Sequence, residues 1–261
     1  MKHYLHKFQN QTAYDTAKAG ANFYKPAVSL IESDKSIIYD PYISPAPPEM
    51  IDLGLTSGTL WAANNIGAEP GSTPESYYGG YYAWGEIKTK NDYSWNTWGS
   101  CKYTLSFDKV TKYCPTSKSS YWGGEGSPDN KYVLDPMDDI ITLTYGESYS
   151  IPREEDLQEL IDETDTEWII SYNDIQNLNG CKFSSKSDPS KFIFIPAAGY
   201  FISDISSPAS GIGNIVNIIS SSIYDYSPSS CRALTANDNS IKLVSLYRIY
   251  GSPIRAIQKL S

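Results

Sequence analysis

The sequence predicts an α+β protein that is mostly β, with a few short helices. The 22 tyrosines among 261 residues suggest many half-buried strands whose aromatic faces reach the surface, and the hydrophobic fraction of 40% is low. Only one long segment has clear helical periodicity, whereas several short runs of β-branched and aromatic residues lie between turn residues. The length suits one large domain, or one medium domain with an appendage.

Net charge and hydropathy exclude two classes of partner. The formal charge of −9 repels phosphate backbones, and no basic cluster overrides it, so we expect no nucleic-acid partner. No apolar run approaches the roughly 18 residues that a spanning helix needs, so we expect no membrane insertion. The first six residues are not followed by a signal-peptide core, which predicts synthesis in the cytoplasm if Met1 is the native start.

The cysteines and histidines predict neither disulfides nor a metal site. The four cysteines lack CxxC spacing and the density of a disulfide scaffold, so we expect reduced thiols. The two histidines lie far from them in sequence, and Asn237-Asp238-Asn239 alone is too sparse for a calcium shell. We therefore expect no cofactor and no metal. The residues concerned are Cys101, Cys114, Cys181, Cys231, His3 and His6.

Residues 1 to 47 are predicted to be a separate N-terminal unit. A short helix from Thr12 to Ala19 is followed by a hairpin of residues 27 to 31 and 36 to 39, with a turn at residues 32 to 35. Such a unit buries too little surface to be stable alone. Residues 1 to 45 should therefore pack on the rest of the chain, on copies of themselves or on a larger assembly. A proline-rich linker ends the unit, and residues 48 to 261 form the main domain.

The main domain is predicted to open with a hairpin of residues 51 to 55 and 58 to 62. Residues 77 to 98 are rich in aromatic residues, which suits either a sugar-stacking platform or core and loop positions; we favour the core. Residues 99 to 139 are expected to be rich in loops. Residues 181 to 183 and 191 to 196 predict a second hairpin.

One helix is predicted from Pro152 to Ile161. Proline suits a first helical turn, three acidic residues suit the positive end of the helix dipole, and Leu157, Leu160 and Ile161 share one face. The acidic residues also suggest acid/base pairs, but a role at the helix start explains them without catalysis. The carboxylates concerned are Glu154, Glu155, Asp156, Asp138 and Asp139.

The last fifth of the chain, residues 213 to 257, is the candidate ligand-binding tract. Serine, tyrosine and asparagine are mixed there with almost no charge, between two segments that predict buried strands. This composition is typical of binding surfaces and also of turns. We expect Ile219, Leu234, Ile254 and Ile257 to be buried below one exposed cluster. The candidate ligand-binding residues are Tyr224, Tyr226, Arg232, Thr235, Asn237, Ser245, Tyr247 and Ile249.

Six motifs together resemble the fibrobacter-type major paralogous domain, which is similar to C-type lectin folds and common in surface and phage proteins of gut bacteria. The match covers roughly residues 50 to 257, and it implies a lectin-like module whose ends meet in a sheet and whose last third binds ligand. The motifs are residues 51 to 62, residues 81 to 86, the Ile151-Pro152 helix start, residues 194 to 200, the Ser220-Ser221-Ser222 triplet and residues 254 to 257.

The C-terminal arrangement also resembles the variable proteins of diversity-generating retroelements. In that family a Tyr-Trp pair precedes the serine triplet and Val-Arg-Pro-Val closes the diversified tract. Here Ile218-Ile219 precedes the triplet and Ile254-Arg255-Ala256-Ile257 closes the tract, so diversification stays open. The helix start also departs from the pattern of that family, because Arg153 stands where a capping threonine is usual. Residues 24 to 31 and 38 to 41 resemble the short heads of phage structural proteins.

The resemblance implies a phage tail receptor-binding protein or adhesin. Residues 1 to 45 would join a virion structural protein and form a homo-oligomer, a trimer as in phage fibres, and the C-terminal tract would bind a protein or glycan receptor on a bacterial surface. The location would be the virion, assembled in the host cytoplasm. The alternative is a fimbrial tip adhesin on a bacterial cell surface.

A third class is enzymatic, because formylglycine-generating oxidases share the implied fold. These enzymes need a reactive cysteine pair, and Cys181 and Cys231 are the candidates in the later part of the domain. Nothing near Cys231 in the sequence would lower its pKa. We therefore expect no catalytic residues and no enzyme.

Overall fold

The computed structural model describes residues 30–33, 36–39, 46–94 and 101–259. The chain divides into two units, Met1–Pro47 and Pro48–Ser261, with the boundary inside the proline-rich segment. Strands predominate over helices, as the sequence predicts. None of the helices in the described residues is long and apolar enough to cross a membrane.

The described part of the first unit is a hairpin. β1 (Leu30–Ser33) pairs antiparallel with β2 (Ser36–Tyr39), so the predicted hairpin is confirmed. Its predicted turn is wrong in extent, because Glu32 and Ser33 belong to the ladder, opposite Ile37 and Ser36. The helix predicted at residues 12 to 19 lies outside the described residues.

The second unit begins and ends in one four-stranded sheet. β3 (Met50–Asp52) and β4 (Leu60–Asn65) form the predicted hairpin, and β16 (Arg255–Gln258) lies between β4 and β8 (Tyr149–Ser150). The buried Arg255 holds this junction, because its guanidinium donates to the Ala62 and Ala63 carbonyls, the Asn65 side chain and the Phe194 carbonyl. The ends of the unit therefore meet in a sheet, as the resemblance implies.

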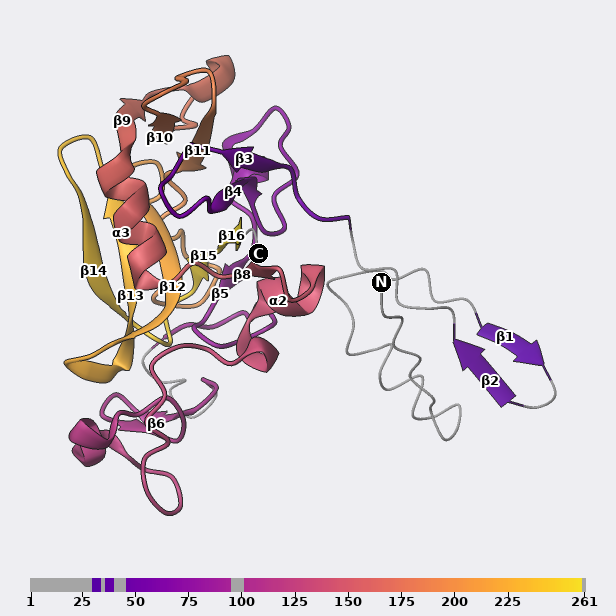
Figure 1. Cartoon of the computed structure of the whole chain (residues 1–261), viewed down its shortest axis with the longest axis vertical. Coiled ribbons are helices and arrows are strands. Elements are labelled where there is room, and N and C mark those ends of the chain that lie inside the picture. Colours follow the sequence, from indigo (N-terminus) through magenta and orange to yellow (C-terminus); the bar gives the residue numbers. More distant parts are fainter. Residues whose placement is uncertain (1–29, 34–35, 40–45, 95–100, 260–261) are drawn as a thin grey trace. The chain divides into compact units, whose positions relative to one another are not determined.

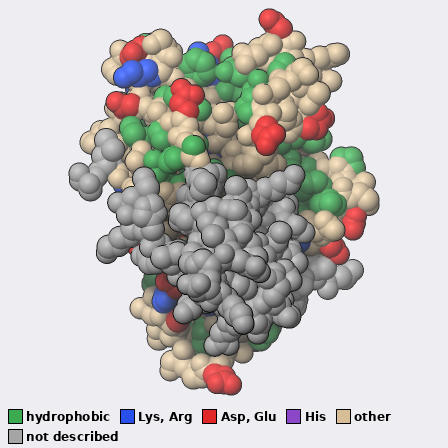
Figure 2. All heavy atoms as spheres, turned by 90° about the vertical axis from the view of Figure 1, so that its right-hand side faces the viewer, with side chains coloured by type: hydrophobic (Ala, Val, Ile, Leu, Met, Phe, Trp, Pro, Cys, Tyr) green, Lys and Arg blue, Asp and Glu red, His purple; other side chains and the backbone are tan. Residues whose placement is uncertain are grey.

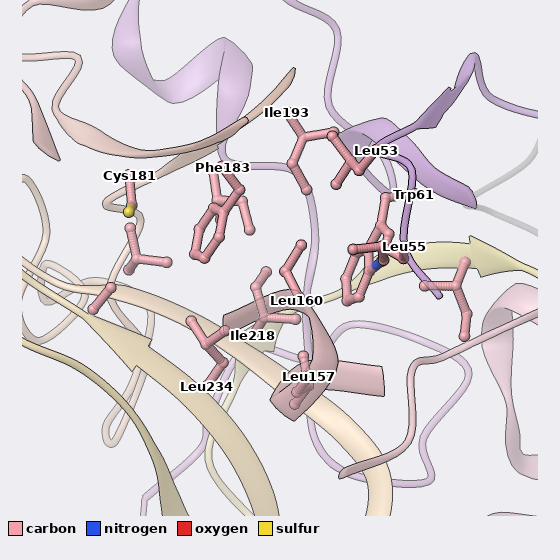
Figure 3. Packing of buried hydrophobic residues seen from close by; sticks show 14 of the residues in the cluster. Leu53, Leu55, Trp61, Leu157, Leu160, Cys181, Phe183, Ile193, Ile218 and Leu234 are labelled. Carbon is pink, nitrogen blue, oxygen red and sulfur yellow. The ribbon is translucent and has the colours of Figure 1, made fainter. Parts of the chain in front are cut away.

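A second sheet and one helix form the other side of the core. β12 (Val216–Tyr224), β13 (Ser227–Ala236) and β14 (Ile241–Tyr247) are antiparallel neighbours, and α3 (Glu154–Glu163) packs on them. Figure 1 shows α3 alongside this sheet. Apolar side chains from the helix, both sheets and a third sheet meet in one core (Figure 3). The core includes Leu53, Trp61, Leu157, Leu160, Phe183, Ile193, Ile218, Leu234 and Ile257.

The start of α3 differs from its predicted form. The helix begins at Glu154, so Pro152 lies before the first turn rather than in it. Arg153 is the N-cap residue, and its backbone N–H donates to the Asp156 carboxylate at 2.8 Å, which is half of a capping box. Leu157 and Leu160 are fully buried, as predicted, and Ile161 packs on the edge of the core.

The third sheet contains the second predicted hairpin. β10 (Gly180–Ser185) lies between β11 (Phe192–Pro196) and β9 (Thr164–Ile169), which directly follows α3. A short pair, β5 (Tyr81–Tyr82) with β15 (Ser252–Pro253), joins the aromatic stretch to the C-terminal strands. Tyr82, Trp84 and Tyr93 are almost fully buried, which favours the core interpretation for the described part of this stretch.

Residues 101 to 139 form a long excursion that contains the hairpin of β6 (Thr104–Ser106) and β7 (Lys109–Val110) and the 3-10 helices η3 (Thr116–Tyr121) and η4 (Pro136–Asp138). The buried Asp138 holds it together. Its carboxylate accepts hydrogen bonds from the hydroxyls of Tyr103 and Tyr113 and from two ammonium groups, those of Lys102 and Lys112, each at 2.6 Å. We call residues 101 to 139 the excursion below.

The described surface is acidic in character. Asp and Glu side chains are more prominent than Lys and Arg on the face that Figure 2 shows, in keeping with the net charge of −9. Such a surface repels anionic polymers.

Candidate ligand-binding site at the β12–β13 hairpin

The serine triplet positions the site. β12 and β13 are in register up to the pair Ile219 and Ala233 and again at Ile223 and Cys231, so Ser220 to Ser222 leave the ladder between them. The triplet is buried and finds other partners. Ser221 N–H donates to the Pro152 carbonyl at 2.7 Å, and the Ser222 hydroxyl accepts from the Glu154 N–H at 3.1 Å. The bulge thus fixes the end of β12 against the start of α3.

Two buried side chains, those of Trp84 and Arg248, support the same region from the interior of the domain. Trp84 donates from its ring N–H to the Ser220 carbonyl at 2.8 Å. Arg248 is fully buried, lies over the Trp84 ring with its guanidinium carbon 4.4 Å from the ring centroid, and donates to the Lys112 and Tyr113 carbonyls at 2.9 and 2.7 Å. Burial lowers the pKa of Arg248 to about 10, so it stays charged at neutral pH. These contacts join the excursion to the sheet.

Beyond this support lies a group of side chains that we call the tyrosine–arginine cluster, in which Tyr226 is exposed and the others are partly buried. Its members are Tyr224, Tyr226, Arg232, Glu154 and Lys118. Tyr226 is 72% exposed, and its ring centroid lies 5.4 Å from that of Tyr224. The guanidinium of Arg232 lies 4.6 Å from the Tyr224 centroid, and the ammonium of Lys118 lies 5.6 Å from that of Tyr226. Each cation therefore faces an aromatic ring.

Arg232 is partly buried, and its guanidinium has few partners. Its Nε lies 2.9 Å from the Glu154 carboxylate, but without hydrogen-bond geometry, so the contact is an ion pair only. The two Nη groups have no hydrogen bond to any described residue, and the side chain is 25% exposed. A planar fork that is stacked on a ring and open at its outer edge suits a carboxylate or carbonyl of a ligand.

The structure brings Tyr224, Tyr226, Arg232 and Ser245 to the same end of the sheet. Ser245 is exposed and lies directly opposite Arg232 in the β13–β14 register, so the two side chains share a face. The buried support is confirmed for Ile219, Leu234, Ile254 and Ile257, each at most 2% exposed.

Two candidate residues lie elsewhere, so the prediction of one continuous surface is wrong for them. Thr235 is three positions from Arg232 on β13 and therefore points to the opposite face of the sheet. Asn237 belongs to the turn at the other end of β13, where its side chain accepts from the Asn239 and Ser240 N–H groups. Its geometry serves the β13–β14 turn.

The last two candidates belong to a second core cluster. Ile249 is fully buried, so its predicted exposure is wrong. Tyr247 is half-buried and packs edge-on against Tyr250 at 5.6 Å, in a cluster that also includes Tyr93. After β14 the chain turns at Tyr247–Tyr250, where the Tyr250 N–H donates to the Tyr247 carbonyl, and Ile249 enters the core.

Sequence reasoning missed two members of the cluster. Glu154 was assigned to the start of α3, and it is there, but the serine triplet also brings its carboxylate to Arg232. Lys118 lies on η3 in a segment expected to be loop, and no spacing in the sequence connects it with Tyr226. Both depend on contacts between segments far apart in the chain.

The four cysteines and Asp138 are buried. All four cysteines are free, and burial raises the pKa values of Cys181 and Cys231 to about 12. Burial raises the pKa of Asp138, but the hydrogen bonds from Lys102, Lys112 and the two tyrosines lower it by more than burial raises it. The pKa of Asp138 is therefore well below its usual range. Within the described ranges, no group of three or more His, Cys, Asp or Glu side chains is arranged to hold a metal ion.

Comparisons with known proteins add no relative to this geometry. No family model matches the chain, and neither a curated protein nor a solved structure matches it significantly.

Proposed function

We propose that the chain is a receptor-binding protein with a C-type lectin-like domain, of the kind found on phage tails, and that it recognises a bacterial surface through the tyrosine–arginine cluster. The observation that carries this proposal is the contrast between tip and support. Tyr226 is 72% exposed at the β12–β13 turn, whereas the serine triplet below it is at most 7% exposed. A binding site with exposed tips on a fixed base pays little entropy on binding.

The residue types in the cluster suit recognition. Tyrosine and arginine are the side chains most often found as energetic centres of interfaces, where each contributes about 2 kcal/mol or more when central. Here Tyr224 contacts both Tyr226 and Arg232, and Glu154 forms an ion pair with the guanidinium. Three features support the lectin-like fold in this proposal: the two ends of the domain meet in one sheet, the serine triplet is present, and Arg255 is buried at the junction of that sheet.

The proposal places the attachment function in residues 1 to 45, which would join a virion structural protein and make the chain a homo-oligomer. A cell-surface adhesin would use the same ligand site in a different setting. The oxidase alternative is not favoured, because Cys181 lies in the apolar core and Cys231 is buried below the sheet, with pKa values of both thiols far above neutral.

Attachment to cells tests the proposal. The full chain is labelled with a fluorophore and mixed with a panel of gut-bacterial isolates, and bound protein is measured by flow cytometry. We expect wild type to attach to at least one isolate and Tyr224→Ala/Tyr226→Ala to lose that attachment. The matched control is Tyr200→Ala, which removes a tyrosine that stacks on Tyr250, outside the cluster. Wild-type attachment by the double variant would refute the proposed site.

A further inference from the structure

A cavity lies beside the sheet in which the two ends of the second unit meet. Its volume is about 220 Å³, and every residue that lines it belongs to the second unit. Asn64 lies in β4, Ala256 in β16 and Tyr145 at the end of α2 (Ile140–Tyr145), while Glu49 directly precedes β3. Segments from both ends and from the middle of the unit therefore enclose one space (Figure 1).

An irregularity in the pairing of β4 with β16 lies at this cavity. Arg255 pairs with Asn65, and Ile257 pairs with Trp61. Between these two pairs β4 has residues 62 to 64, whereas β16 has only Ala256. Such a bulge interrupts the regular ladder and bends the strand that carries the extra residues. Because Ala256 contributes only a methyl group to the lining, its side chain leaves this space open.

The walls of the cavity are fixed by contacts within the unit. The Asn65 side chain donates to the Tyr78 carbonyl at 3.0 Å and accepts from Nε of the buried Arg255 at 2.9 Å. On another wall, the ring of Tyr145 packs edge-on against that of Tyr149, with 6.0 Å between the centroids. A site whose walls are already ordered loses little conformational entropy when it binds a ligand.

Two residues of the lining have polar side chains with capacity for a ligand. The amide of Asn64 is partly buried and has no hydrogen bond to a described residue. The carboxylate of Glu49 is exposed and has neither a hydrogen bond nor an ion pair with a described residue. The described residues that line the cavity include no Lys, Arg or His. A partly buried amide takes its hydrogen-bond partners from water or from a ligand when the protein supplies none.

We propose that this cavity is a second ligand site, which binds one neutral sugar unit; the proposal does not depend on the tyrosine–arginine cluster. Sugar hydroxyls both donate and accept, which matches the Asn64 amide and the acceptor oxygens of Glu49. The Tyr145 ring supplies an apolar face for the C–H groups of a pyranose.

Charge and size restrict the ligand further. An anion would meet the Glu49 carboxylate with no cation in the lining to offset it. An ammonium group only donates, so it would leave the N–H groups of the Asn64 amide without an acceptor. A volume of 220 Å³ holds about seven water molecules, which suits a single pyranose rather than an oligosaccharide chain.

Saturation-transfer NMR on the full chain tests the proposal, with glucose, galactose, mannose and N-acetylglucosamine as neutral probes and with ethanolamine and acetate as charged probes. We expect saturation transfer to at least one of the four sugars and to neither charged probe. Asn64→Ala, Glu49→Ala and Ala68→Phe, which fills the cavity from its lining, should each weaken that sugar's binding by about tenfold or more. The matched control is Asn214→Ala, which changes an exposed asparagine outside the lining. Unchanged melting temperatures show that each variant is folded.

Three results would overturn the proposal. No saturation transfer to any of the four sugars would mean that the cavity holds water only. Transfer to ethanolamine or acetate without transfer to a sugar would identify a charged ligand. Sugar binding that is lost in Tyr224→Ala/Tyr226→Ala but kept in Asn64→Ala and Ala68→Phe would assign the sugar to the tyrosine–arginine cluster. None of these results bears on attachment to cells through that cluster, so the proposed function is tested separately.

Discussion

Replacing Arg248 tests whether the excursion and the β12–β14 sheet form one stable unit. This arginine is fully buried, and its hydrogen-bond partners among the described residues are backbone carbonyls, with no carboxylate. Its fork donates to the carbonyls of Lys112 and Tyr113 and stacks on Trp84. Alanine would leave two buried carbonyls without donors and a cavity beside the indole ring.

The expected loss follows from these contacts. Hydrogen bonds from a charged donor contribute about 1.5 to 3 kcal/mol each, and a desolvated cation–π contact adds about 2 kcal/mol. The desolvation of the guanidinium opposes these gains by several kcal/mol. We therefore expect Arg248→Ala to lose about 3 kcal/mol of unfolding free energy. At about 2 to 4 °C per kcal/mol for a domain of this size, the melting temperature should fall by roughly 6 to 12 °C.

Arg248→Met is the matched variant, because it fills most of the volume but donates no hydrogen bond and carries no charge. We expect it to lose roughly half as much free energy as alanine, since no cavity forms and the charge is no longer desolvated. Thermal unfolding by circular dichroism measures both, and limited proteolysis shows whether cleavage within the excursion accelerates. A change below about 1 kcal/mol for Arg248→Ala would refute the role of the buried guanidinium.

Three further predictions concern stability and reactivity. Asp138→Asn should lower the free energy of unfolding by about 2 to 3 kcal/mol at neutral pH, measured by urea unfolding. The folded pKa of Asp138 lies below its unfolded value of 3.8, so the difference between wild type and variant should shrink as the pH falls below 4. A difference that stays constant with pH would contradict the role of the Asp138 network. The thiols of Cys181 and Cys231, with pKa values of about 12, should react with Ellman's reagent at pH 8 only after unfolding, so fast reaction of the native chain would be inconsistent with their burial. Residues 48 to 261 expressed alone should unfold cooperatively and be monomeric in light scattering, whereas the full chain should be oligomeric. A monomeric full chain at micromolar concentration would count against assembly through residues 1 to 45.

Local sequence signals predicted several of the elements but not all of them. The hairpins of β3–β4 and β10–β11 and the apolar face of α3 follow from alternation, turn residues and 3.6-residue periodicity. The prediction of the helix start was wrong at Pro152, because proline suits several positions near a helix N-terminus. In the structure, the Pro152 carbonyl accepts a hydrogen bond from the Ser221 N–H. Sequence alone does not show such a tertiary contact.

The candidate site was predicted in part. At the β12–β13 turn, Tyr226 is exposed as expected, whereas Tyr224 is partly buried. Ile249 was misplaced, since β14 ends at Tyr247 and Ile249 is buried in a second core cluster. Composition identifies the tract, but register and turns decide which side chains meet, and these depend on pairing between distant segments.

The most direct test of the account asks where the bacterial partner touches the chain. A photoreactive p-benzoylphenylalanine is placed at Tyr226 of the full chain, and at Ile170 as the control, and each protein is irradiated on the cells to which wild type attaches. The account predicts a covalent adduct from position 226 and none from position 170. An adduct from position 170 with none from position 226 would contradict the claim that the β12–β13 hairpin is the ligand-binding site.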